Sequence, residues 1–89
     1  MEQKEMTKVQ KAFEKAVVKL EKMYDLSDRS LVRCYHDKES VSVDGELHSI
    51  MNGMSDHLGH AWSVLEQAVE DCGYYIENVN GCDWKFYKA

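Results

Sequence analysis

The first 25 residues carry apolar and basic side chains at helical spacing on opposite sides. The apolar positions are Met6, Val9, Phe13, Val17, Leu20 and Tyr24. Six lysines follow the same rhythm, and we call them the lysine stripe: Lys4, Lys8, Lys11, Lys15, Lys19 and Lys22. The stripe covers an arc of roughly 80°, and the apolar positions centre roughly 150° away from it. The pattern predicts an amphipathic helix over about residues 4–25, with Glu14, Glu21 and Asp25 along one edge of the stripe.

A short β-hairpin is predicted after this helix. Residues 26–30 are turn formers that end the helical pattern, and residues 31–36 read as a strand. A turn at 37–40 leads to a short alternating strand at 41–43. Asp44 and Gly45 close this unit.

The longest periodic pattern in the chain predicts a second helix over residues 46–72. Its apolar positions are Leu47, Ile50, Met51, Met54, Leu58, Ala61, Trp62, Leu65, Val69 and Cys72. Gly73 is expected to terminate this helix. Small residues dominate the opposite face, and Gly53 and Gly59 are costly inside a helix. Either another backbone approaches this face closely, or the face is exposed and tolerates weak helix formers.

The tail predicts a second hairpin, with strands at 74–79 and 82–87 around Asn80-Gly81. A type I′ turn there sets the cross-strand pairs. One face then holds Val79 with Cys82, Glu77 with Trp84 and Tyr75 with Phe86. The other face holds Asn78 with Asp83, Ile76 with Lys85 and Tyr74 with Tyr87. If Trp84 and Phe86 are buried, the second face points outward.

These elements give an α+β fold over a single domain, residues 1–89. The order α-β-β-α-β-β predicts an antiparallel sheet of up to four strands with both amphipathic helices packed on one face. The absence of an apolar run near 18 residues and of a signal-peptide core predicts a cytoplasmic protein without a membrane span. Three cysteines without C-x-x-C spacing are expected to be reduced thiols, two or three of them buried: Cys34, Cys72 and Cys82.

Charge divides the chain into two unlike parts. The net charge is −5, but residues 1–29 hold seven of the eleven basic and six of the sixteen acidic residues. Residues 30–89 therefore carry a net charge of −6. An acidic total argues against general nucleic-acid affinity and suits a protein partner with a basic surface.

The sequence carries no motif that predicts catalysis. It has no nucleophile elbow and no glycine-rich phosphate loop, so we expect no enzyme and no cofactor. His57 and His60 lie one helical turn apart, but two imidazoles do not complete a metal site, so no metal is expected.

Three candidate surfaces remain. The first is a partner-binding surface on the second hairpin and the helix end before it, formed by Tyr74, Ile76, Tyr87, Glu70, Asp71, Glu77 and Asp83. The second is a self-association surface on the second helix, formed by Gly53, Asp56, Gly59, His60 and Ser63. The third is the lysine stripe, whose six side chains would contact phosphates if the protein bound nucleic acid; its alternative role is simple solvation.

The favoured hypothesis is a small acidic protein-binding module that inhibits or regulates a larger, basic, nucleic-acid-handling protein machine. The alternatives are a nucleic-acid-binding accessory factor and a self-associating structural protein, such as a homodimer. In size, acidity and lack of catalytic motifs the chain is similar to small inhibitors and accessory factors encoded by phages and mobile elements. That likeness is one of type, and no motif carries it.

Overall fold

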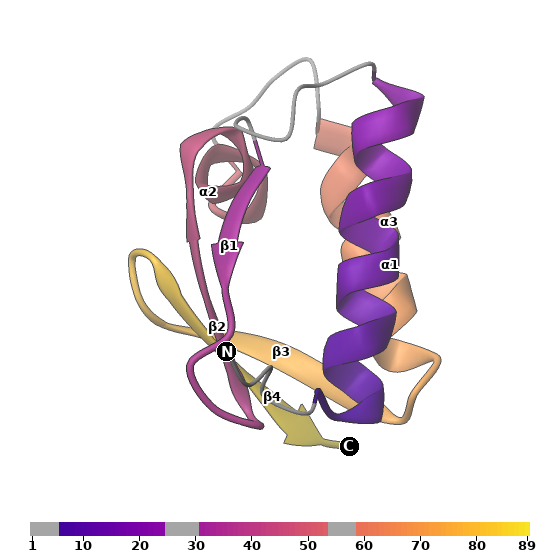
Figure 1. Cartoon of the computed structure of the whole chain (residues 1–89), viewed down its shortest axis with the longest axis vertical. Coiled ribbons are helices and arrows are strands. Elements are labelled where there is room, and N and C mark those ends of the chain that lie inside the picture. The colour runs from indigo at the N-terminus through magenta and orange to yellow at the C-terminus, as the bar shows by residue number, and fades with distance from the viewer. Residues whose placement is uncertain (1–5, 25–30, 54–58) are drawn as a thin grey trace, which may run out of the picture.

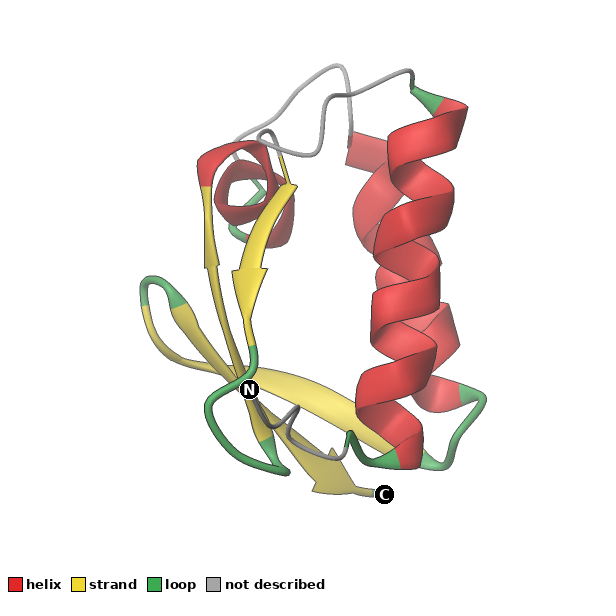
Figure 2. Ribbon diagram, in the orientation of Figure 1, coloured by secondary structure: helices red, strands yellow, loops and turns green. Residues whose placement is uncertain are grey.

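The computed structural model describes residues 6–24, 31–53 and 59–89. Its elements are α1 (Lys8–Met23), β1 (Leu31–Cys34), β2 (Ser40–Asp44), α2 (Gly45–Met51), α3 (Gly59–Glu70), β3 (Tyr74–Asn80) and β4 (Asp83–Lys88). The predicted α+β class is confirmed, with three helices and one antiparallel sheet (Figure 2). The order is α-β-β-α-α-β-β, which is one helix more than predicted.

The two hairpins join side by side into one sheet. The strand order is β1-β2-β4-β3, and all neighbouring strands are antiparallel. The central contact pairs Val41 of β2 with Trp84 of β4. Helices α1 and α3 pack against each other on one side of the sheet, while α2 contacts β1 and β2 (Figure 1). β1 and β3 are therefore the edge strands.

Helix α1 begins with a reciprocal cap. The Thr7 hydroxyl accepts a hydrogen bond from the Gln10 backbone N–H, and the Gln10 side chain accepts one from the Thr7 backbone N–H. The Gln10 amide also donates to the backbone oxygens of Asp37 and Ser40, which explains how a polar side chain is buried here. The predicted helix is confirmed from Lys8 to Met23; Lys4 lies outside the described residues.

The single long second helix predicted over residues 46–72 is wrong. Helix α2 ends at Met51, and Gly53 follows at φ +71°, a left-handed conformation that no helix contains. The Gly53 N–H bonds to the oxygen of Ile50, as in a helix-terminating glycine motif. The three-four rhythm continued past Gly53, so periodicity alone could not show the break. This glycine serves a turn and not the close approach of another backbone.

The predicted register of the second hairpin is also wrong. Asn80 pairs with Asp83, and a bulge between Asn78 and Asn80 takes up one residue. Tyr75 therefore lies opposite Tyr87, and Ile76 opposite Phe86. The predicted register would have placed Glu77 on the core side beside Trp84, whereas the observed one buries part of Ile76 there. Leaving a carboxylate in water favours the observed pairing.

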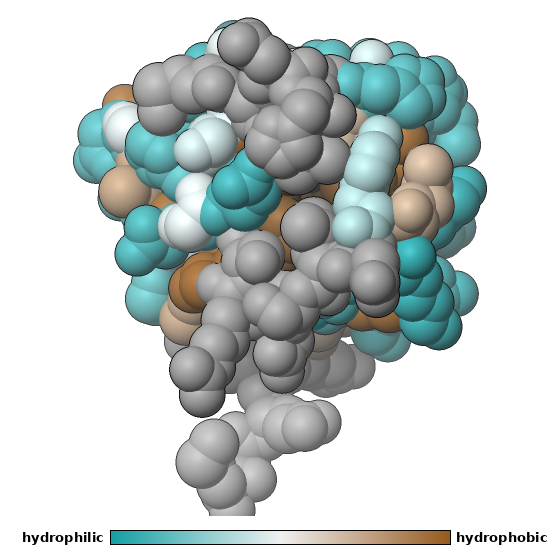
Figure 3. Space-filling view, turned by 90° about the horizontal axis from the view of Figure 1, so that it is seen from above, coloured by the Kyte–Doolittle hydropathy of each residue, from teal (hydrophilic) through white to brown (hydrophobic). Residues whose placement is uncertain are grey.

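A continuous apolar core connects the helices with the sheet. It consists of Val9, Phe13, Ala16, Val17, Leu20, Leu31, Val41, Val43, Leu47, Ile50, Met51, Ala61, Leu65, Val69, Trp84 and Phe86. Phe13 meets Phe86 edge to face at 5.6 Å, and Trp62 lies 5.4 Å from Trp84, between ring centroids. The burial of Trp84 and Phe86 is as predicted. At the end of the molecule where α1 ends, the described surface is mostly hydrophilic, and some hydrophobic residues are visible between the hydrophilic ones (Figure 3).

Candidate functional site

The side of the sheet opposite to α1 and α3 presents the alternate residues of the four strands. We call it the outer sheet face. Its members are Val32, Cys34, Ser40, Ser42, Asp44, Tyr75, Glu77, Asp83, Lys85 and Tyr87. Strand pairing makes these residues neighbours across the sheet, because cross-strand partners lie on the same face.

A stacked tyrosine pair occupies one end of the outer sheet face. The rings of Tyr75 and Tyr87 lie 5.4 Å apart at an interplanar angle of 24°, and Tyr75 is 42 % exposed. The Lys85 ammonium lies 5.6 Å from the centre of the Tyr87 ring and 3.8 Å from the Glu39 carboxylate. Val32, at the other edge of the face, is 43 % exposed. The face thus combines aromatic and aliphatic surface with charge.

Carboxylates lie between these two apolar ends. Glu77 of β3 lies directly opposite Lys85 of β4 in the strand register. Asp83 accepts a hydrogen bond from the Ser42 hydroxyl, and Asp44 ends β2 as the N-cap of α2. The outer sheet face thus contains three carboxylates and one lysine, so its net charge is negative.

The predicted partner-binding residues do not form one surface. Tyr87, Glu77 and Asp83 lie on the outer sheet face. Tyr74 and Ile76, which were expected there, are half-buried against the core because of the shifted register. Tyr75 takes their place on the outside. One signal in the sequence favours this exchange, because burying Glu77 costs more free energy than burying Ile76.

The other two members of that predicted set lie elsewhere. Glu70 and Asp71 are exposed at the end of α3. Tyr74 and Tyr87 do line a common hollow of about 420 Å³ at the end of the hairpin. Lys38, Lys85 and Lys88 also line it together with Glu39, so lysines outnumber carboxylates among the described residues of this corner, and Glu70, Asp71, Glu77 and Asp83 are not among them.

The predicted self-association surface is divided between two helices and their connection. Gly53 ends α2, Gly59 begins α3, and Asp56 lies outside the described residues. His60 and Ser63 are exposed on α3. The single face of small residues on one helix is therefore not formed.

The lysine stripe is confirmed as a solvent-facing row along α1. The exposed members are Lys8, Lys11, Lys15, Lys19 and Lys22. Within the ranges that the structure describes, none of these five ammonium groups lies within 4.0 Å of a carboxylate.

The carboxylates of α1 are occupied by an arginine of the edge strand, which the sequence did not indicate. Arg33 donates from Nε to Glu14 Oε1 at 3.0 Å and from Nη1 to Glu21 Oε2 at 3.1 Å. The Tyr35 hydroxyl donates to Glu14 Oε1 at 2.8 Å. This network ties β1 to α1 and takes both acidic groups away from the lysine stripe.

Protonation in this network follows from its geometry. Burial raises the pKa of Glu14, but hydrogen bonds from Arg33 and Tyr35 and the guanidinium charge outweigh it and hold that pKa below its usual range. The hydrogen bonds from Arg33 to Glu14 raise the pKa of Arg33. Burial and the Glu14 charge raise the pKa of Tyr35, so its hydroxyl stays a donor. The cluster is a structural ion pair in which Glu14 stays ionised to lower pH than an unpaired glutamate.

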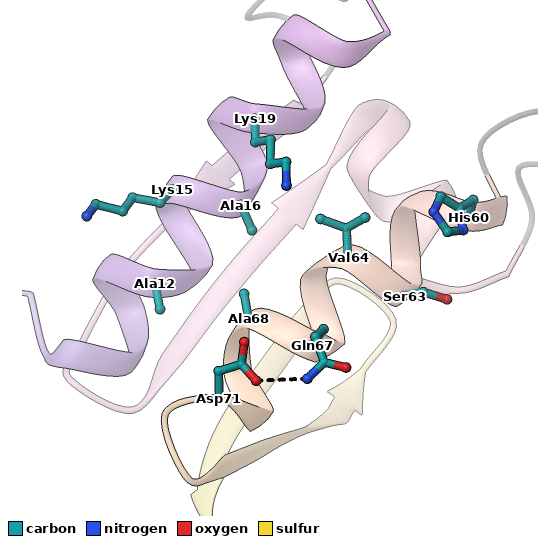
Figure 4. Close-up of a pocket in the computed structure, with 10 residues that line it drawn as sticks. All are labelled: Ala12, Lys15, Ala16, Lys19, His60, Ser63, Val64, Gln67, Ala68 and Asp71. Carbon is teal, nitrogen blue, oxygen red and sulfur yellow. Dashed lines mark hydrogen bonds between the residues drawn. The ribbon is translucent and has the colours of Figure 1, made fainter.

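A groove runs between α1 and α3 beside the lysine stripe (Figure 4). Its volume is about 500 Å³. Four small apolar residues point into it from both helices: Ala12, Ala16, Val64 and Ala68. Lys15 and Lys19 flank it on α1, while the α3 side consists of His60, Ser63, Gln67 and Asp71.

The three cysteines are unpaired, and one of them lies beside a histidine. Cys34 and Cys82 are exposed, contrary to the expected burial, and Cys72 is half-buried. The Cys34 thiol lies 3.9 Å from His36 Nδ1. No cluster of three or more His, Cys, Asp or Glu side chains is arranged for a metal among the described residues, and His57 lies outside them.

No known family model, curated protein or solved structure matches this chain. Of the helices in residues 6–24, 31–53 and 59–89, none is long and apolar enough to cross a bilayer. Two surfaces of the described residues are candidates for binding: the outer sheet face and the groove beside the lysine stripe.

Proposed function

We propose that the protein is a non-catalytic binding module whose outer sheet face docks onto another protein. The observation that carries this proposal is the stacked pair of Tyr75 and Tyr87 on a sheet face opposite to the helices. Tyrosines that expose both ring and hydroxyl are enriched in protein interfaces, where they bury large area at low entropic cost. Val32 extends the apolar surface toward the other sheet edge.

The charge of this face suggests the chemistry of the partner. Asp44, Glu77 and Asp83 would attract a surface rich in lysine and arginine. Proteins that handle nucleic acid present such surfaces in the channels that hold the phosphate backbone. The proposal is therefore an inhibitor or regulator that occupies the basic surface of such a protein.

The test is capture of a partner followed by affinity measurement on the identified complex. Replacing Tyr75→Ala together with Tyr87→Ala should weaken binding at least tenfold, about 1.4 kcal/mol, because the central anchors are lost. Titration calorimetry with the purified partner measures the change. Glu77→Lys should mainly slow association, which stopped-flow mixing at two salt concentrations would show.

Met23→Ala is the matched control. Met23 is 51 % exposed, but it ends α1 and does not belong to the outer sheet face. Its replacement should leave the affinity unchanged. Full binding by the double tyrosine variant, with its circular dichroism spectrum intact, would contradict the proposal.

A further inference from the structure

The groove between α1 and α3 has features that the proposed function does not use. We propose that it is a second docking site, which accepts an acidic amphipathic helix from a partner protein. Its floor is made of small apolar side chains, its α1 rim is basic, and the described residues that line it include no aromatic side chain.

The floor of the groove allows a helix to approach closely. Ala12 and Ala16 come from α1, and Val64 and Ala68 come from α3. All four point into the space between the helices (Figure 4). Short side chains on both walls let a third helix pack in the groove with its apolar residues at i, i+3 or i+4 and i+7.

The rim on α1 selects for negative charge. The Lys19 side chain extends over the groove, whereas the Lys15 side chain, although Lys15 also lines the groove, points away from α3 (Figure 4). Because Arg33 engages Glu14 and Glu21, these lysines have no competing carboxylate on their own helix. A glutamate-flanked helix would supply the missing partners for the stripe.

The opposite rim leaves room for such a helix without strong repulsion. Asp71 is the carboxylate on this side, and it already accepts a hydrogen bond from Gln67 Nε2 at 2.8 Å. Ser63 and His60 complete the rim and can donate hydrogen bonds.

A polypeptide fits the groove better than a nucleic acid does. Sites for single strands combine basic residues with aromatic platforms for the bases. Among the described residues that line this groove there is no phenylalanine, tyrosine or tryptophan, and the two with basic side chains that stay charged are lysines, Lys15 and Lys19. The small apolar floor is suited to aliphatic side chains instead.

The test uses a synthetic 18-residue peptide with leucines at i, i+3 or i+4 and i+7 and glutamates beside them. A second peptide carries glutamine in place of every glutamate. Fluorescence anisotropy should show the full-length protein binding the glutamate peptide at least tenfold more tightly than the glutamine peptide. Lys15→Glu with Lys19→Glu should weaken binding of the glutamate peptide at least tenfold.

Two further variants separate the groove from general attraction. Lys38→Glu with Lys88→Glu makes the same change in net charge at exposed positions outside the groove, and it should alter the affinity less than threefold. Ser63→Trp places a bulky neutral side chain on the exposed rim and should also reduce binding at least tenfold. Circular dichroism of each variant checks that it is folded.

Four results would overturn the inference. The wild-type protein could fail to bind the glutamate peptide. Alternatively, the two double charge-reversal variants, at Lys15 and Lys19 and at Lys38 and Lys88, could weaken binding equally. A 12-nucleotide oligouridine could displace the peptide and itself depend on Lys15 and Lys19, which would make the stripe a nucleic-acid site. Light scattering could instead show a dimer that Ser63→Trp dissociates, which would make a second copy the occupant.

Discussion

At the scale of single residues, Arg33 makes more side-chain contacts within the fold than any described lysine of the stripe. It satisfies Glu14, Glu21 and the backbone oxygen of Leu31 from one half-buried guanidinium. Arg33→Ala leaves two carboxylates without their donor, so we expect the free energy of unfolding to fall by about 2 kcal/mol. Urea denaturation measures it. Lys38→Ala, at an exposed position, is the control and should change stability by less than about 0.5 kcal/mol.

The lowered pKa of Glu14 makes part of the stability depend on pH. A carboxyl whose pKa is lower in the folded than in the unfolded protein stabilises the fold above its unfolded pKa, near 4.5, and loses that contribution as the pH falls through the folded value. The stability difference between the wild type and Glu14→Gln should therefore shrink as the pH drops below 4.5. Denaturation at several pH values tests this. Glu70→Gln, on the exposed end of α3, should show a smaller change; a constant difference for Glu14→Gln would contradict the assignment.

At the scale of elements, Gly53 decides that the second helical stretch is not continuous. Its φ of +71° is unfavourable for residues with a side chain, although an added Cβ would meet nothing within 4 Å. Gly53→Ala should therefore destabilise the protein by about 1 kcal/mol through backbone strain alone. Gly53→Asn should cost less, because asparagine tolerates this conformation. Thermal unfolding compares the two; equal losses would point to a cause other than strain.

At the scale of the whole molecule, the shared core predicts a single unfolding transition. Trp62 and Trp84 lie together between α3 and β4, so their fluorescence reports tertiary packing, while far-ultraviolet circular dichroism reports the helices. Both signals should change at the same urea concentration, because the core connects the helices with the sheet. The three cysteines are unpaired, so reductant should leave the midpoint unchanged, as should chelator. Two separate transitions would show that the layers unfold independently.

The opposite charges of the two proposed surfaces also belong to this scale. The lysine stripe lies on α1, whereas the carboxylates of the outer sheet face lie on β2, β3 and β4. α1 and α3 lie on the other side of the sheet from that face (Figure 1). The described lysines of the stripe and these three carboxylates therefore lie on opposite sides of the sheet, whereas Glu70 and Asp71 lie at the end of α3, on the same side as the stripe.

The sequence by itself determined what depends on neighbours along the chain. The spacing of Phe13, Val17 and Leu20 predicted α1 and its buried side, and the lysines had to be exposed because they lie away from that side. The alternation of apolar and polar residues likewise predicted the strands and the burial of Trp84 and Phe86.

Only the tertiary structure decided what depends on contacts between distant residues. The hairpin register follows from which side chains the helices cover, so it exchanged Tyr75 for Tyr74 on the outer sheet face. The pairing of Arg33 with Glu14 joins residues 19 positions apart, which no local pattern indicates. The groove exists because α1 and α3 pack together, and periodicity describes each helix but not its partner. The spacing of residues along the chain determines which side of a helix or strand is apolar. Which apolar sides pack against each other depends on the burial of side chains in the folded protein.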